Sequence, residues 1–177
     1  MGVPDIKAVR ELARTRFFRV EALDLRFSNG VERTYERLAG GGLPAVMVVA
    51  MTDDRQLVLI REYCAGFHEV QLTLVKGAAE HEESLEEAAD RELKEEAGFG
   101  ARNIRFLKRL NLAPGHMGFT VLLATDLYPA SLPADEPEPP EVVLWPLDRL
   151  DELIHLEEFQ EARAIAALCL ARDHLTR

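Results

Sequence analysis

The segment from Gly77 to Phe99 constrains this chain of 177 residues more than any other stretch does. It reads GAAEHEESLEEAADRELKEEAGF, and from Gly77 to Glu96 it holds nine acidic residues against two basic ones. The formal net charge of the whole chain is −10, so most of the acidic excess lies in this segment. A helix that carries so much like charge repels itself unless a cation lies on it. The segment therefore predicts a helix with a bound cation.

Local signals predict where this helix begins and ends. Ser84 followed three residues later by Glu87 is a capping-box signature at the start. Gly98 suits the left-handed residue that ends a helix. Apolar residues between these ends recur at helical spacing and predict a buried face. They are Leu85, Ala88, Ala89 and Leu93.

Three carboxylates of the predicted helix can reach a common patch. Glu92 and Glu96 are four residues apart, and Glu92 and Glu95 are three apart, so all three fall on adjacent turns. Hard oxygen ligands gathered in this way suit Mg²⁺ or Mn²⁺, which complete their shells with waters and substrate phosphates. The ordinary alternative is a solvated surface helix with many ion pairs.

The spacing of the fixed residues decides between these two interpretations. A glycine is followed after five residues by a glutamate, and after seven more by the block RELKEEAGF. This pattern resembles the Nudix box, which reads G-x5-E-x7-R-E-apolar-x-E-E-x-G-apolar. Every fixed position of the box is met, at Gly77, Glu83, Arg91, Glu92, Leu93, Glu95, Glu96, Gly98 and Phe99.

The resemblance implies a role for each acidic residue at the end of the helix. Glu92 and Glu96 would bind the metal ion directly, and the backbone carbonyl of Lys76 would be a third ligand. Glu95 would be a further ligand or the base that takes a proton from the attacking water. Nudix enzymes hydrolyse a nucleoside diphosphate linked to another group, while metal ions neutralise the charge that develops on the phosphates.

Other residues of the motif would be structural. The resemblance implies that Glu83 and Arg91 form an ion pair that holds the preceding loop against the helix. Gly77 allows a turn and a close approach of the backbone to another group.

The catalytic base has a second candidate position later in the chain. In the ADP-ribose pyrophosphatase branch of the family, a glutamate from a later loop takes this role. The proline-rich acidic loop at 128–140 contains Glu136 and Glu138, so the base is either Glu95 or one of these two. The alternative for the loop is a polar tether without a catalytic role.

Further features narrow the substrate. Pro114 lies 15 residues beyond Phe99, and ADP-ribose pyrophosphatases of the family resemble this chain in carrying a proline there. Arg61, at the end of a predicted strand, suits phosphate oxygens because its guanidinium is a bidentate fork. The alternative role for Arg61 is a surface ion pair with Glu62 or another neighbour. Fragments spread over residues 14–172 resemble family members that hydrolyse ADP-linked compounds.

The resemblance implies a Mg²⁺-dependent pyrophosphohydrolase that cleaves ADP-ribose, NADH and diadenosine oligophosphates and releases AMP. Two alternatives stay open. One is a Nudix hydrolase of another class of substrate, such as nucleotide sugars, nucleoside triphosphates or capped RNA. The other is a catalytically retired nucleotide-binding module. Glu92, Glu95 and Glu96 argue against the second, since a retired site is expected to lose at least one of them.

Residues 17–38 predict a small separate unit before the motif. Asn29 and Gly30 give a strong hairpin turn signal, and the alternation around them predicts two antiparallel strands. The glycine run that follows marks a break. The predicted division is an N-terminal β-hairpin unit at 1–42 and a Nudix hydrolase domain at 43–177. The resemblance also implies a homodimer in which the hairpins pack across the partner subunit.

The remaining segments predict the fold class. Strands are expected at 45–51, 56–63, 67–75, 104–112, 119–128 and 141–146, and helices at 147–153 and 159–175. The run at 45–51, AVMVVAM, is apolar throughout and predicts burial on both faces. Strands, a central helix, more strands and final helices describe an α/β sheet covered by helices. This order agrees with the α/β/α sandwich on a mixed sheet that the resemblance implies.

The composition narrows the partners and the compartment. A pI of about 5.0 argues against a general nucleic-acid binder. It permits a phosphorylated small molecule, because bound metal inverts the local charge. No apolar run approaches a membrane span, and the N-terminus has no signal-peptide core. Cys64 and Cys169 form no ligand pair and suggest a reducing compartment. We therefore expect a cytoplasmic protein with a small nucleotide substrate and no membrane contact.

Overall fold

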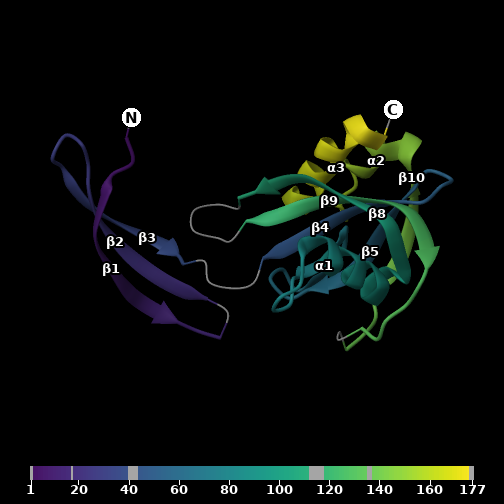
Figure 1. The fold of residues 1–177 in the computed structure, drawn as a ribbon, viewed down its shortest axis with the longest axis horizontal. Helices are drawn as coiled ribbons and strands as arrows, with labels where there is room; N and C mark the ends of the chain where they lie inside the picture. The colour runs from purple at the N-terminus through teal and green to yellow at the C-terminus, as the bar shows by residue number, and fades with distance from the viewer. Residues whose placement is uncertain (1, 17, 40–43, 112–117, 135–136, 176–177) are drawn as a thin grey trace. The chain divides into compact units, whose positions relative to one another are not determined.

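The protein divides into two compact units. The computed structural model describes residues 2–16, 18–39, 44–111, 118–134 and 137–175. The first unit includes the chain up to residue 42, and the second is formed by residues 43–110 and 119–177 (Figure 1). Each unit contains a sheet of its own.

The N-terminal unit is a three-stranded antiparallel sheet in the order β1-β2-β3. Its strands are β1 (Asp5–Arg14), β2 (Arg19–Arg26) and β3 (Glu32–Leu38). The predicted hairpin is confirmed as β2 and β3, with Gly30 at the turn in the left-handed region at φ 81°. Strand β1 was not predicted from the sequence. Two register shifts interrupt its pairing with β2, so its apolar residues do not alternate strictly with polar ones.

The second unit is built on a seven-stranded mixed sheet. Its main path is β10-β5-β4-β9-β8, while β6 pairs with β5 and β7 pairs with β4. β4 and β9 are parallel, and the other pairs are antiparallel. The strands are β4 (Ala45–Met51), β5 (Gln56–Cys64), β6 (Glu69–Thr73), β7 (Val75–Ala78), β8 (Phe99–Leu110), β9 (Phe119–Pro129) and β10 (Glu141–Pro146).

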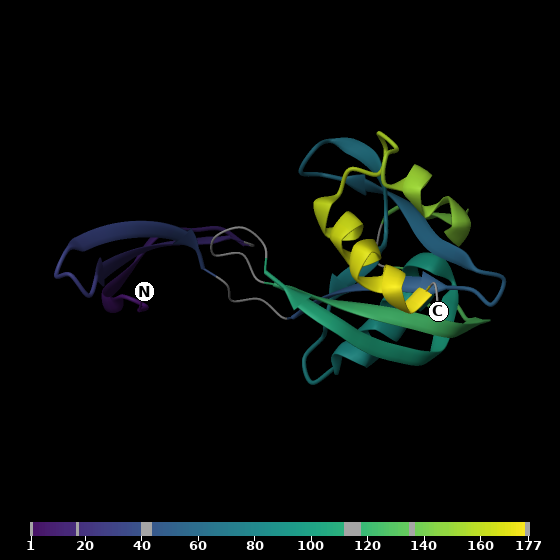
Figure 2. The same ribbon diagram turned by 90° about the horizontal axis from the view of Figure 1, so that it is seen from above.

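Helices lie on both sides of this sheet, with α1 on one side and α3 on the other (Figure 2). Together with the mixed sheet, this arrangement confirms the predicted fold class. The helical segments are α1 (Leu85–Glu92), the π-helix η1 (Leu93–Ala97), the 3-10 helix η2 (Leu147–Arg149), α2 (Leu150–Leu153) and α3 (Ala162–Leu175). Among the residues that the structure describes, none of the helices has the length and apolar character needed to cross a membrane.

The central strand β4 is buried on both faces, as predicted. Residues 46–50 are each at most 1% exposed. Val46, Val48 and Ala50 belong to the core beneath α1. The residues between them point to the opposite face, where α3 also contacts β4. The strand therefore fixes the positions of the strands that pair with it, including β7.

The predicted strand at 67–75 is wrong as a single element, because the chain changes partner within it. Residues up to Thr73 form β6 beside β5, whereas Val75 begins β7 beside β4. Leu74 lies between the two strands and is fully buried. The apolar side chains continue through the change, so the sequence pattern does not reveal it. This change brings Lys76 and Gly77 against the central strand.

Two other predicted boundaries differ from the structure. β8 begins at Phe99 and not at residue 104, because its first residues pair with the end of β9 although they lack an apolar alternation. α3 begins at Ala162 and not at Phe159. The carbonyl of Glu158 accepts a hydrogen bond from Leu72 N (2.9 Å), which holds the segment before the helix against β6.

Candidate active site

The acidic helix begins as predicted. Ser84 Oγ accepts a hydrogen bond from Glu87 N (3.2 Å), and Glu87 Oε2 accepts one from Ser84 N (2.9 Å). This reciprocal pair satisfies backbone donors that the first helical turn would otherwise leave free. α1 then buries Ala88 and Ala89 in the core under the sheet. The helix is thus fixed at its start and along one face.

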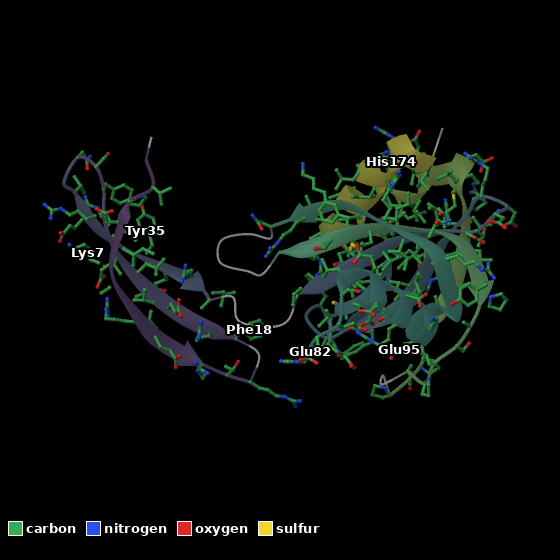
Figure 3. The ribbon with its side chains drawn as sticks, viewed as in Figure 1. Lys7, Phe18, Tyr35, Glu82, Glu95 and His174 are labelled. Atoms are coloured by element: carbon green, nitrogen blue, oxygen red, sulfur yellow. The ribbon has the colours of Figure 1, made fainter. Side chains whose placement is uncertain are left out.

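The last turn of the helix is wider than an α-helical turn. Residues Leu93–Ala97 form the π-helix η1, and Gly98 ends it with a φ of 71°, as predicted for this position. Single π-helical turns are rare and occur frequently at functional sites. Glu95, which Figure 3 labels, and Glu96 lie on this turn. Their directions relative to Glu92 therefore differ from those that α-helical spacing predicts.

Each of the three carboxylates predicted to bind metal accepts a hydrogen bond in the structure, and two of them share one donor. Arg91 Nη1 donates to Glu92 Oε1 (2.9 Å) and to Glu95 Oε2 (2.8 Å). Glu96 Oε2 accepts a hydrogen bond from Lys76 N (3.2 Å). Within the described ranges, no group of three acidic, histidine or cysteine side chains could hold a metal ion as they stand. The metal-binding role of these glutamates stays a prediction.

Arg91 also ties the helix to the loop that precedes it. Its Nε and Nη2 donate to the two carboxylate oxygens of Glu83 at 2.9 and 3.1 Å, and Nη2 donates to the carbonyl of Ala78 at 2.9 Å. The predicted ion pair is therefore present. Hydrogen bonds from Arg91 hold the pKa of Glu83 below its ordinary value, and those to Glu83 raise the pKa of Arg91.

Gly77 and Glu92 pack against each other. Gly77 lies on β7 opposite Val46 of the central strand. A Cβ added at Gly77 would overlap the carboxylate of Glu92. The close approach predicted at this glycine is confirmed, and the group that it admits is one of the predicted ligands. Replacing the glycine would force that carboxylate to move.

Glu96 is a half-buried residue whose carboxylate lies in acidic surroundings. Burial raises its pKa to about 8; the hydrogen bond from Lys76 N opposes this rise, and the charges of Glu62 and Glu92 add to it. A divalent cation beside these carboxylates would favour their charged forms. The hard oxygen donors and the space that Gly77 leaves for Glu92 fit Mg²⁺ or Mn²⁺.

Lys76 connects this cluster to the neighbouring strand. Its Nζ contacts Glu62 Oε1 on β5 and lies 3.9 Å from Glu161 Oε2. Glu161 Oε2 also accepts a hydrogen bond from Thr73 Oγ1 (2.6 Å). Neither Glu62 nor Glu161 was predicted from the sequence to lie at the site. Glu161 is 88 positions from Thr73, and no local pattern signals a pair so far apart.

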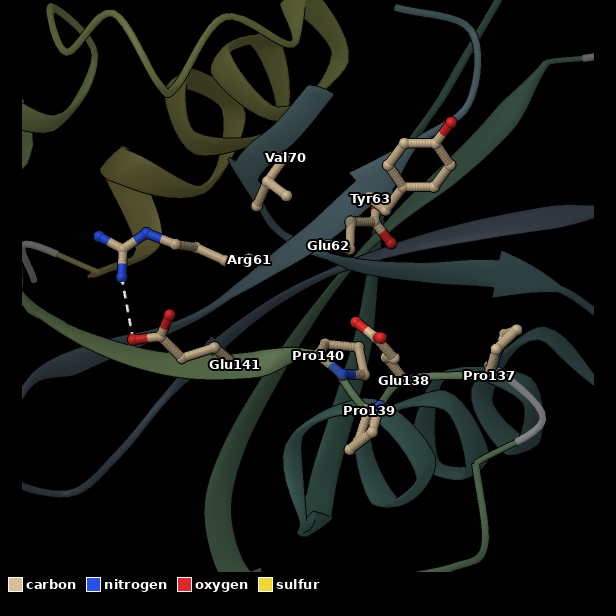
Figure 4. Close-up of a pocket in the computed structure, with 9 residues that line it drawn as sticks. All are labelled: Arg61, Glu62, Tyr63, Val70, Pro137, Glu138, Pro139, Pro140 and Glu141. Carbon is tan, nitrogen blue, oxygen red and sulfur yellow. Dashed lines mark hydrogen bonds and ion pairs between the residues drawn. The ribbon is translucent and has the colours of Figure 1, made fainter. Parts of the chain in front are cut away.

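A pocket of about 360 Å³ opens beside Glu62 (Figure 4). It lies next to the cluster of Glu92, Glu95 and Glu96, because Glu62 in its wall contacts the side chain of Lys76. Strand β5, strand β6 and the segment before β10 contribute its walls. The lining residues are 61–63, Val70 and 137–141.

The pocket brings together two of the predicted site residues. Arg61 and Glu138 both line it, although they are far apart in the sequence. Glu136 and Pro114, which were also predicted to serve the site, lie outside the described residues. The roles of all four residues stay predictions.

Arg61 is paired, but not with the neighbour considered from the sequence. Its Nε and Nη2 donate to the two carboxylate oxygens of Glu158 at 3.0 and 3.1 Å, and its Nη1 donates to Glu141 Oε1 at 3.1 Å. Hydrogen bonding to Glu158 raises the pKa of Arg61. Glu158 lies 97 positions from Arg61, so local sequence reasoning could not identify it.

Comparison with known proteins identifies the family of the chain. Residues 4–37 match the NudE-type Nudix hydrolase N-terminal domain, and residues 42–168 match the NUDIX domain. The chain is 48% identical over 174 residues to the ADP compounds hydrolase NudE of Escherichia coli (strain K12), covering 97% of this chain and 93% of that protein. It is also similar to a crystal structure of an ADP compounds hydrolase, with a TM-score of 0.92, 47% identity, and coverage of 99% and 96% of the two chains. The chain therefore belongs to the Nudix family.

Proposed function

We propose that the protein is a Mg²⁺-dependent pyrophosphohydrolase that cleaves the diphosphate of ADP-linked compounds and releases AMP. The observation that carries this proposal is the similarity of nearly the whole chain to an ADP compounds hydrolase. The presence of Glu92, Glu95 and Glu96 supports hydrolysis over a retired binding module, because a retired site is expected to lose at least one of them. The substrates that we propose are ADP-ribose, NADH and diadenosine oligophosphates.

The metal ion would be held by Glu92, Glu95, Glu96 and the carbonyl of Lys76, with Mn²⁺ as a possible substitute for Mg²⁺. When bound, the ion supplies positive charge that stabilises the charge developing on the diphosphate. Arg91 orients Glu92 and Glu95 through its Nη1. The backbone N–H of Lys76 orients Glu96.

We propose Glu138 as the base that takes the proton of the attacking water, with Glu95 and Glu136 as the other candidates. Glu138 lines the pocket. Glu95, in contrast, accepts a hydrogen bond from Arg91 at 2.8 Å. A base must be free to reach the water that it deprotonates. The position of Glu138 therefore supports it over Glu95.

Arg61 and Pro114 are proposed substrate contacts. Arg61 lines the pocket, while its charge is shared by Glu158 and Glu141. A phosphate contact would require it to release one of these carboxylates. We therefore propose that Arg61 keeps its ion pairs with Glu158 and Glu141 and contacts the substrate as part of the pocket wall.

The direct test is a panel of substrates. Purified protein with Mg²⁺ is expected to release AMP from ADP-ribose, NADH and diadenosine triphosphate, with the products identified by chromatography. Turnover of nucleotide sugars, nucleoside triphosphates or capped RNA, without turnover of ADP-linked compounds, would assign another Nudix specificity. Binding of these compounds without hydrolysis would assign a retired module.

We further propose that residues 1–42 and 43–177 are separate domains and that the first pairs two subunits into a homodimer. The match of residues 4–37 to a domain of their own supports this division. Exposed apolar side chains on the N-terminal sheet support a role in association. A cytoplasmic location is also proposed, and the free thiols of Cys64 and Cys169 are consistent with a reducing compartment.

A further inference from the structure

One carboxylate oxygen contacts both strands at the point where the chain changes partner. Glu161 Oε2 accepts a hydrogen bond from Thr73 Oγ1 at 2.6 Å and lies 3.9 Å from Lys76 Nζ. Thr73 is the last residue of β6, Lys76 lies on β7, and Leu74 belongs to neither strand. The carboxylate of Glu161 therefore spans the point at which the chain leaves β5 and joins β4.

The position of Glu161 is fixed by the segment that leads into α3. The carbonyl of Glu158 accepts a hydrogen bond from Leu72 N at 2.9 Å, and Phe159 is buried. On the other side, the carbonyl of Glu161 accepts a hydrogen bond from Ile165 N at 3.1 Å, in the first turn of α3. Because the backbone is anchored on both sides of Glu161, its side chain can hold other groups in place.

The contacts of Glu161 are largely shielded from water. The side chains of Glu161 and Lys76 are 13% and 18% exposed, and Thr73 is buried. A buried hydroxyl group requires a hydrogen-bond partner, and an ion pair that is shielded from water is stronger than an exposed one. Lys76 Nζ also contacts Glu62 on β5. Two carboxylates from separate elements thus hold the ammonium group.

The backbone at Lys76 contacts the predicted metal ligands. Its N–H donates to Glu96 Oε2 at 3.2 Å, and its carbonyl is itself a proposed ligand. At the next residue, Gly77, the missing Cβ leaves the space that the carboxylate of Glu92 occupies. A shift of this short strand would therefore move the N–H, the carbonyl and the space at Gly77 together.

We infer that Glu161 is a positioning residue for metal binding. It holds Lys76 through the ammonium group, and through Lys76 it keeps Glu96 and the Lys76 carbonyl in the geometry that the ion requires. The inference rests on the proposed function, in which these groups bind the ion. Glu161 acts through Lys76 in this role and touches neither the ion nor the substrate.

The test is the binding of Mn²⁺ alone, measured from the electron paramagnetic resonance signal of the free ion. Glu161→Gln keeps an oxygen that can accept the hydrogen bond from Thr73, but it has no charge to hold Lys76. We expect the dissociation constant for Mn²⁺ to rise about tenfold, at the lower end of the range for residues that orient metal ligands.

Glu158→Gln is the matched control. Glu158 belongs to the same segment, and its replacement removes an ion pair with Arg61. This variant is expected to bind Mn²⁺ as tightly as the wild-type protein does. Denaturant unfolding of each variant measures the loss of stability separately from the loss of metal affinity.

A double-mutant cycle tests whether Glu161 acts through the ammonium group. Lys76→Met removes this group but keeps an unbranched side chain and the backbone N–H and carbonyl. In the Lys76→Met background, Glu161→Gln should have little further effect on the affinity for Mn²⁺. An effect that depends on the presence of Lys76 is not expected if Glu161 only supports the packing of α3.

Kinetics provide a second measurement. The Mg²⁺ concentration for half-maximal release of AMP from ADP-ribose should rise about tenfold in Glu161→Gln, in line with the loss of metal affinity. The kcat at saturating Mg²⁺ should stay close to that of the wild-type protein, because the ligands themselves are still present. Excess Mg²⁺ should not restore Glu96→Gln, which lacks a ligand.

Other outcomes would overturn the inference. They are a wild-type protein that binds no Mn²⁺, unchanged affinity in Glu161→Gln, an equal loss in Glu158→Gln, or the same loss in the Lys76→Met background. A lower free energy of unfolding with unchanged Mn²⁺ affinity would leave Glu161 only a structural role. Failure of the proposed function looks different, since the wild-type protein would then bind Mn²⁺ but release no AMP from any ADP-linked compound.

Discussion

At Glu96, burial disfavours the charged form of the carboxylate that a metal ion would need. Glu96 is half-buried, and desolvation raises its pKa to about 8, with the charges of Glu62 and Glu92 adding to the rise. Glu96→Gln keeps an oxygen that can accept the hydrogen bond from Lys76 N, but it removes the negative charge that a metal ion needs. We predict a loss of kcat of at least about a hundredfold with little loss of fold. Rates of AMP release and thermal unfolding measure the two effects.

The metal dependence of stability provides the control for this variant. Mg²⁺ that binds only the folded state should raise the melting temperature of the wild-type protein. The same concentration should have little effect on Glu96→Gln. Undiminished hydrolysis in the variant, or an equal rise in its melting temperature, would show that the metal is held elsewhere.

Replacing the two glycines of the motif by alanine should affect metal binding and stability differently. A Cβ at Gly77 would overlap the carboxylate of Glu92, so Gly77→Ala should weaken Mg²⁺ binding and activity more than it weakens the fold. Gly98 has a φ of 71°, so Gly98→Ala should instead cost about 1–2 kcal/mol of stability. Denaturant unfolding and Mg²⁺ titration of both variants measure the contrast. Equal effects of the two variants on Mg²⁺ affinity would contradict it.

Local sequence signals predicted the contacts that are local in the chain. The ion pair of Glu83 with Arg91 and the capping box of the helix span eight positions or fewer. The pairing of Arg61 with Glu158 spans 97 positions and depends on how the segment before α3 packs on β6. No periodicity or spacing carries that information. The motif could therefore be assigned from the sequence, but its surroundings could not.

At the scale of elements, apolar patterning predicted the strands but not their partners. The stretch from Glu69 to Ala78 is divided into β6 and β7 because it leaves β5 and joins β4 at Leu74. That change depends on tertiary packing, because the buried side chains continue through it. The same limit explains β1, where two register shifts remove the alternation that identifies a strand. The sheet covered by helices followed from the order of the elements, whereas its mixed strand directions were implied only by the resemblance to the Nudix family.

The segment before β10 supplies a prediction about the catalytic base. Glu138→Gln should lower kcat more than it changes KM, because a base acts in the transition state and not in binding. General-base catalysis contributes about 10²–10⁴-fold, which sets the expected size of the loss. Steady-state kinetics with ADP-ribose at several pH values measure it. Glu136→Gln, made in parallel, tests the other glutamate of this loop.

These two variants separate the candidates for the base. A large loss of kcat in only one variant would assign the base to that residue. Unchanged kcat in both variants would leave Glu95 as the base and the loop as a polar wall. In that case Glu95→Gln should show the loss, although its hydrogen bond with Arg91 means that it could also disturb the helix.

At the scale of the whole molecule, the N-terminal sheet presents a row of apolar side chains. Val9, Leu23 and Tyr35 are opposite one another on the three strands, so they lie on one face. Val9 and Tyr35 are 49% and 51% exposed, while Leu23 between them is buried. A three-stranded sheet is too small to enclose such a row by itself. The proposed homodimer would cover it with a second copy.

A charge placed in this row should separate the proposed dimer. The wild-type chain of 19.9 kDa is expected to sediment at twice that mass. Val9→Glu should raise the dissociation constant of the dimer at least about a hundredfold, because an unpaired charge is costly to bury. Glu36→Gln is the control, since Glu36 follows Tyr35 on β3 and points to the opposite face. Sedimentation velocity over a range of concentrations measures both variants. A monomeric wild-type protein, or a Val9→Glu variant that remains dimeric, would place the subunit interface elsewhere or exclude it.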